Sequence, residues 1–73
     1  MPSLNLWRQL IDDAIVRQGV FENNTLEFWH WLQVVHYHQP KLDFSEKLAE
    51  EILDNVKELV VEYKAYKARA RGQ

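Results

Sequence analysis

The sequence predicts an all-α protein: a three-helix bundle with a long C-terminal helix, completed by dimerisation. Three observations support this fold class. The chain has 73 residues, of which 47% are hydrophobic, so residues 1–73 are expected to form one globular domain. Away from its ends it contains one glycine, Gly19, and one proline, Pro40, which divide it into three segments. In each segment the apolar residues recur at helical spacing.

The first helix is expected over residues 3–18. Ser3 is a good N-cap residue, and Gly19 tolerates the left-handed conformation that commonly ends a helix. The apolar residues between them recur at spacings of three and four: Leu4, Trp7, Leu10, Ile11, Ala14 and Ile15. This pattern is typical of an amphipathic helix that buries one face.

The second helix is expected over residues 25–37, where Asn24 and Glu27 have the spacing of a capping box. Apolar side chains cover most of its circumference: Leu26, Phe28, Trp29, Trp31, Leu32, Val34, Val35 and Tyr37. A strand is the alternative, since aromatic and β-branched residues are common here, but these residues come in adjacent pairs and do not alternate. Such a helix needs cover on most sides, so Trp29 and Trp31 are interpreted as core or as partner-binding residues.

The third helix is expected over residues 45–69. It begins either with a capping box formed by Asp43 and Glu46 or with Ser45 as the N-cap. Its apolar residues alternate spacings of three and four: Ala49, Ile52, Val56, Leu59, Tyr63, Tyr66 and Ala70. At ~1.5 Å per residue, this helix would be about 36 Å long and each of the other two about 20 Å.

The difference in helix length predicts an exposed apolar overhang around Val60, Tyr63 and Tyr66. Either this overhang packs against another chain, most simply a second copy in a two-fold homodimer, or it frays. Tyr63 and Tyr66 are therefore candidate partner-binding residues, because tyrosine combines an apolar body with a polar tip.

Acidic residues recur every four positions along the third helix: Glu46, Glu50, Asp54, Glu58 and Glu62. Like charges at this spacing repel by ~0.2–0.5 kcal/mol per pair. The pattern indicates either a solvated face that keeps the protein soluble or a recognition stripe for a basic partner. In the second interpretation, Glu50, Asp54 and Glu58 are candidate contacts.

The charge inverts in the tail, residues 64–73, which contains Lys64, Lys67, Arg69 and Arg71 and no acid. Cations at the C-terminal end of a helix complement its macrodipole. The alternative is a contact with nucleic acid, where basic residues meet phosphates and tyrosines stack on bases. Against it stand the net charge of −2 and the lack of a nucleic-acid-binding signature.

The three histidines do not have the spacing of a metal site. His30, His36 and His38 do not share one helix face, so no metal is expected. A pocket for a flat ligand in the Trp and His segment is a further alternative, but no cofactor is expected. The chain has no cysteine, no glycine-rich phosphate loop and no spaced acid–base pair, which argues against an enzyme.

Together these observations predict a small non-enzymatic module, a regulator or adaptor, that binds a protein partner and self-associates. A nucleic-acid-associated regulator and a ligand-binding module are the alternatives. Residues 1–19 lack a basic start followed by an apolar run, and the longest apolar stretch, 28–37, is too short to span a bilayer. We therefore expect a cytoplasmic protein that does not bind membranes.

Overall fold

The computed structural model describes residues 3–72, and its regular elements are all helical. They are α1 (Leu4–Arg17), the 3-10 turn η1 (Glu22–Asn24), α2 (Thr25–Trp31), the π-helical turn η2 (Leu32–His36), α3 (Glu46–Asp54) and α4 (Val56–Arg71). The all-helical prediction is confirmed for the described residues, which contain no strand. Residues 1, 2 and 73 lie outside the described residues, and with them the ends of the predicted domain 1–73 and tail 64–73.

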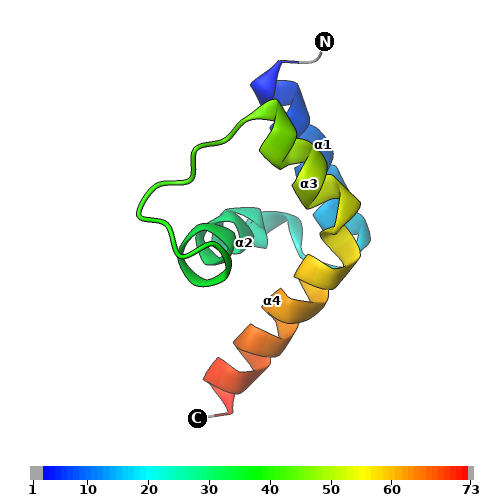
Figure 1. Cartoon of the computed structure of the whole chain (residues 1–73). Helices are drawn as coiled ribbons and strands as arrows, with labels where there is room; N and C mark the ends of the chain where they lie inside the picture. The colour runs from blue at the N-terminus through cyan, green and yellow to red at the C-terminus, as the bar shows by residue number, and fades with distance from the viewer. Residues whose placement is uncertain (1–2, 73) are drawn as a thin grey trace.

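The helices α3 and α4 together form a bent rod along one side of the molecule (Figure 1). Helix α1 runs beside α3. Helix α2 lies across the rod and contacts the middle of α4 at Tyr63 and Lys67. An extended segment, residues 37–45, returns from η2 to the start of α3. The last turns of α4 continue past α2, so the C-terminus lies at the far end of the rod from the N-terminus.

Both expected caps of α1 form. The hydroxyl of Ser3 accepts a hydrogen bond from an amide of the first turn, and Gly19 has a φ of 95°. The amide of Gly19 donates to Val16 O and that of Val20 to Ile15 O, both at 3.0 Å, which is the Schellman pattern of a helix C-terminus. Ile15 and Val20 are both buried, as this motif favours.

The expected capping box at the start of α2 is wrong. The Asn24 side chain makes no capping hydrogen bond, and the Asn24 backbone belongs to η1 and is not extended. The Glu27 carboxylate instead accepts from Lys67 Nζ at 3.1 Å and from the Tyr63 hydroxyl at 3.4 Å. The Lys67 ammonium carries a full positive charge, whereas a capping box would offer Glu27 only a neutral backbone amide, so the carboxylate binds the tertiary partner.

The single long helix expected over 45–69 is also wrong, because the structure breaks it at Asn55. This residue has φ −114° and ψ 17°, and its side-chain Nδ2 donates to Glu51 O at 2.8 Å. Asparagine side chains offer the backbone such alternatives to the helical ladder. The ladder resumes where Leu59 N donates to Asn55 O. Of the two possible starts, Ser45 is the N-cap: its hydroxyl accepts from the amide three residues on.

One hydrophobic core joins all four α-helices. Its buried members are Ile11, Ile15, Val20, Phe28, Trp29, Trp31, Leu32, Ala49, Ile52, Leu59, Val60 and Tyr63. The expected overhang is therefore wrong for Val60 and Tyr63, which are 3% and 4% exposed, and only Tyr66 at 40% remains. The reason is that α1 and α2 lie one after the other along the rod, so α2 covers the part of α4 that α1 does not reach.

Candidate protein-binding groove

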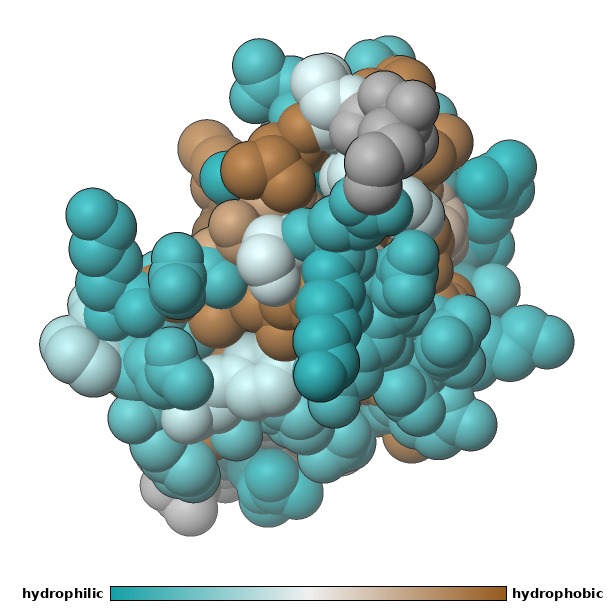
Figure 2. Space-filling view, turned by 45° about the horizontal axis from the view of Figure 1, so that its top comes forward, coloured by the Kyte–Doolittle hydropathy of each residue, from teal (hydrophilic) through white to brown (hydrophobic). Residues whose placement is uncertain are grey.

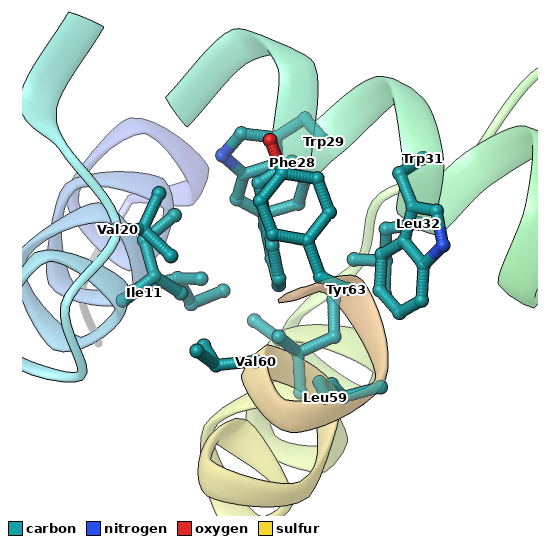
Figure 3. Packing of buried hydrophobic residues seen from close by; sticks show 12 residues of the cluster. Ile11, Val20, Phe28, Trp29, Trp31, Leu32, Leu59, Val60 and Tyr63 are labelled. Atoms are coloured by element: carbon teal, nitrogen blue, oxygen red, sulfur yellow. The ribbon is translucent and has the colours of Figure 1, made fainter. Parts of the chain in front are cut away.

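The contact between α2 and α4 is made by large aromatic rings. Phe28 lies 5.3 Å from Tyr63 and 5.7 Å from Trp31 between ring centroids, and these side chains point into the space between the two helices (Figure 3). The structure therefore places Trp29, Trp31 and Tyr63, all candidate partner-binding residues, in the core of this chain. Their rings hold the backbones of α2 and α4 apart.

The two buried tryptophans of α2 differ in their polar contacts. Trp29 Nε1 donates to Asp12 Oδ1 at 2.6 Å, and the Arg8 guanidinium carbon lies 4.5 Å from the Trp29 ring centroid. Trp31 Nε1 is buried and has no acceptor among residues 3–72. An unsatisfied buried donor costs about 1–3 kcal/mol. Trp29 is thus tied to α1, whereas Trp31 is held by ring contacts alone.

A groove of about 580 Å³ opens on the outer side of these rings, between α2 and the C-terminal half of α4. Its apolar walls are exposed: Leu26 at 73%, Val34 at 43% and Tyr66 at 40%. Trp31 and Tyr63 also line it. The remaining apolar lining residues are Val35 and Ala70. The groove exists because α2 is apolar nearly all round while α4 covers only one of its sides.

The charged residues of this groove are mostly cationic. Glu27 and Lys67 form an ion pair at 3.1 Å, and the hydrogen bond to Glu27 raises the pKa of Lys67. Burial raises the pKa of the Tyr63 hydroxyl beside them. Arg71 and His30 also line the groove, and neither forms an ion pair among the described residues. Because Lys67 neutralises the Glu27 carboxylate and the Arg71 guanidinium is unpaired among the described residues, the edge of the groove carries excess positive charge.

The four basic candidates of the tail do not form one surface. Lys64 Nζ donates to Gln18 O at 2.9 Å and Lys67 binds Glu27, so both tie α4 to other parts of the chain. Lys64, Lys67 and Arg71 line a smaller pocket of about 260 Å³ near the end of α1, whereas Arg69 points to a different side of α4.

The predicted acidic stripe is divided by the bend between α3 and α4. Glu50 and Asp54 lie on α3 and Glu58 on α4, and all three are exposed. None of them lines the groove or forms an ion pair among the described residues. The structure therefore does not bring the acidic candidates together with the aromatic or basic ones.

A second groove, of about 490 Å³, lies between the outer side of α4 and the turn that follows η2. Val61, Glu62 and Arg69 line it from α4, and His36 lines it from η2. His36 Nδ1 is 3.9 Å from Glu62 Oε1. This groove meets the first one at three shared residues, which are Trp31, Val35 and Tyr66.

Several exposed apolar residues of these grooves were not among the sequence candidates. Leu26 and His30 of α2 and Val34 of η2 line the same groove at intervals of four residues, and this spacing was available in the sequence. Val61 is 67% exposed on α4, outside the repeating apolar pattern. Apolar surface is not confined to the grooves: Figure 2 shows hydrophobic side chains at the surface around the N-terminal end, where Leu4 and Leu6 are also exposed.

Within residues 3–72, no three acidic or histidine side chains come together as a metal site would require. None of the described helices combines the length and the hydropathy that crossing a bilayer needs. Comparisons of the chain with protein-family models, with curated proteins and with solved structures found no match. Any function therefore has to be argued from the geometry of this molecule alone.

Proposed function

We propose that this chain is a small cytoplasmic, non-enzymatic module, a regulator or adaptor, that binds an acidic amphipathic helix of another protein. The binding site is the groove between α2 and α4. The observation that carries the proposal is the apolar lining of this groove, where Leu26, Val34 and Tyr66 are exposed over a volume of about 580 Å³. Exposed apolar residues that gather in one groove with a polar rim are typical of interaction sites, whereas singly scattered ones are not.

The shape of the groove favours a helical ligand. Its two walls are helical, and the exposed positions Leu26 of α2 and Val34 of η2 are eight residues apart, about 12 Å at ~1.5 Å per residue. A helix bound in such a groove presents apolar anchors at spacings of three, four and seven residues. Anchors seven residues apart on a ligand helix, about 10.5 Å at ~1.5 Å per residue, come close to this length.

The charge of the groove favours acidic side chains on that ligand. Arg71 is unpaired among the described residues, and the Lys67 ammonium is already satisfied by Glu27. A carboxylate on the polar edge of a bound helix would meet the Arg71 guanidinium, whose planar donors suit carboxylates. Opposite charge across an interface contributes mainly to specificity and association rate.

The two alternatives have less support. A nucleic-acid surface would need several free cations on one side, but Lys64 and Lys67 are hydrogen-bonded within the chain, and Arg69 lines a different pocket from Arg71. A slot for a flat ligand would need a gap between rings, but Trp29 packs edge-on against Phe44 at 5.5 Å and Phe28 packs against Trp31. The groove on the outer side of these rings suits a rounded helix better than a planar molecule.

A selection from a random peptide library with this protein as bait tests the proposal. We expect the selected peptides to share apolar residues spaced three or four apart and to carry an excess of Asp and Glu. Leu26→Lys should abolish their binding. The matched control is Leu6→Lys, which places the same charge on an exposed leucine of α1 outside the groove and should leave binding unchanged.

A charge reversal makes the test sharper. Arg71→Glu should shift the selected peptides from acidic toward basic residues while keeping their apolar spacing. Peptides that bind the Leu26→Lys variant as well as the original protein would overturn the groove as the site. Binding of labelled single-stranded DNA or RNA at low salt, lost as salt is added, would favour the nucleic-acid alternative.

Self-association is the second part of the proposed function. The surface first expected to carry it is mostly buried, since Val60 and Tyr63 pack within the chain. A homodimer therefore needs a different face of α4.

A further inference from the structure

We infer that two copies of this chain associate through the outer face of α4, with the two helices antiparallel and a two-fold axis between Ala65 and Tyr66. The inference rests on the proposed self-association and names its interface. It uses the second groove and leaves the apolar walls on α2 free for another protein.

The outer face of α4 has no cover from the rest of the chain. Val61 is 67% exposed, and Ala65 is also exposed one turn further along the helix. Successive residues are about 100° apart, so these two lie opposite the buried Tyr63. The small Ala65 side chain allows a second helix to approach closely, within the usual 8–10 Å between packed helix axes.

Glu62 and Arg69 flank this face on the same side of the helix. They are seven residues apart, about 10.5 Å at ~1.5 Å per residue, so they cannot pair with each other within one chain. Arg69 forms no ion pair among the described residues, and the ion-pair partner of Glu62 there is the His36 imidazole at 3.9 Å, which carries a charge only when protonated. Each chain thus presents one acid and one base that lack a strong partner.

An antiparallel pair brings these charges together twice. With the axis between Ala65 and Tyr66, Glu62 of one copy lies level with Arg69 of the other, and the symmetry repeats the pair. A parallel pair would place Glu62 beside Glu62 and Arg69 beside Arg69, which repel. The distribution of charge along α4, acidic at Glu58 and Glu62 and basic from Lys64 onward, therefore selects the antiparallel arrangement.

The second groove gives the partner helix additional surface. It lies along the same side of α4 and is lined by His36, Tyr66 and Arg69, with a volume of about 490 Å³. Tyr66 sits beside the axis, so the two Tyr66 rings of a dimer lie close to each other and extend the contact. Because the contact is one helix wide and its ion pairs are exposed, we expect a modest dimer that weakens with added salt.

Sedimentation equilibrium over a series of protein concentrations tests the interface through two charge reversals, Glu62→Arg and Arg69→Glu. Each variant alone replaces both intermolecular attractions with repulsions. The dissociation constant of the dimer should rise by about ten-fold or more in each. An equal mixture of the two variants should recover the original affinity, because every Arg of one chain then meets a Glu of the other.

The control is Glu50→Arg, which reverses an exposed acid on α3 outside this face and should leave the dissociation constant unchanged. A dimer that survives both single reversals would overturn the antiparallel interface but leave self-association standing. A monomer at all concentrations up to about 1 mM would overturn self-association as well. Neither result decides whether a helix binds in the α2–α4 groove, because the peptide selection measures that binding separately.

Discussion

The two ends of this molecule pack their helices in different ways. At one end α1 lies directly against α3, and the buried side chains are aliphatic or small: Ile11, Ile15, Ala49 and Ile52. At the other end α2 faces α4 across three large rings, those of Phe28, Trp31 and Tyr63. Small side chains let the first pair close, whereas the rings keep the second pair apart and leave a groove beside them.

The comparison indicates how one small chain combines stability with an exposed apolar surface. A domain of 73 residues has little apolar surface to spare, because a single core of this size supports only a few kcal/mol of stability. Three aromatic rings bury a large area per residue on the side of α2 that faces α4, while Trp29 is covered by α1 and Phe44. The outer side of α2 remains available to a partner.

The largest expected effect is at the ring contact. Phe28→Ala should destabilise the fold by about 3–5 kcal/mol, enough to unfold most of a domain this small, because Phe28 is fully buried between Trp31 and Tyr63. Urea denaturation followed by circular dichroism measures it. Ile52→Ala in the α1–α3 contact should destabilise the fold by about 2–5 kcal/mol. If Phe28→Ala lowered the free energy of unfolding by less than Ile52→Ala, the aromatic rings would not be the main support of the α2–α4 contact.

The next effect separates the two tryptophans. Trp29→Phe should destabilise the protein by about 1–2 kcal/mol more than Trp31→Phe, because it removes the 2.6 Å hydrogen bond to Asp12. Trp31→Phe removes a buried N–H that has no acceptor among the described residues. Thermal unfolding of both variants gives the comparison. Equal losses would mean that the Asp12 bond contributes little to the link between α2 and α1.

An effect of similar size is expected in the segments that connect the α1–α3 contact with the α2–α4 contact. Gly19→Ala should cost about 1–2 kcal/mol, because φ is 95° and an added Cβ would lie 2.7 Å from Lys64 Nζ. His38 has a φ of 55°, and His38→Gly should change stability in the opposite direction, by about 0.5 kcal/mol. Midpoints of urea unfolding measure both changes. A stabilised Gly19→Ala variant would contradict the left-handed cap.

The smallest effect is a loss of stability at alkaline pH that arises at the α2–α4 contact. Burial raises the pKa of Tyr63 above its usual 10.0, so the folded state holds that proton more tightly than the unfolded state does. This contribution is fully present below about pH 10 and is lost as pH rises through the folded pKa. The raised pKa of Lys67 acts in the same direction.

The melting temperature should therefore fall above about pH 10, and less steeply in Tyr63→Phe than in the original protein. Tyr37, whose pKa burial also raises, remains in both proteins and is a common background. An identical alkaline slope in the two proteins would show that Tyr63 does not titrate differently in the folded state.

Sequence reasoning succeeded where the interacting groups are close together in the chain. Ser3, Gly19 and Ser45 cap their helices through backbone groups only a few residues away. The spacing of Asn24 and Glu27 suggested the same local physics, but Glu27 binds Lys67, forty positions further on. A local sequence pattern contains no information about a distant residue that can bind the same carboxylate.

The candidate site shows the same limit. The aromatic character of α2 and the exposed position of Tyr66 followed from composition and spacing. The sequence did not show that Trp29 and Trp31 face inward while Leu26 and Val34 face outward. A helix that is apolar all round has no preferred inner side. Asn55 likewise carried no strong signal of a break, since asparagine is tolerated within helices at a small cost.

By itself, the sequence determined which segments are helical, where α1 begins and ends, where α2 and α3 begin, and that one helix would be apolar almost all round. Helix periodicity and capping depend on neighbours within about four residues, so they can be read along the chain. Only the tertiary structure decided that α1 and α2 cover the rod in succession, that the rod bends at Asn55, and that a groove stays open beside α4. Those features depend on the way in which bulky side chains from distant segments fill the space between the helices. The spacing of residues along the chain does not specify this packing.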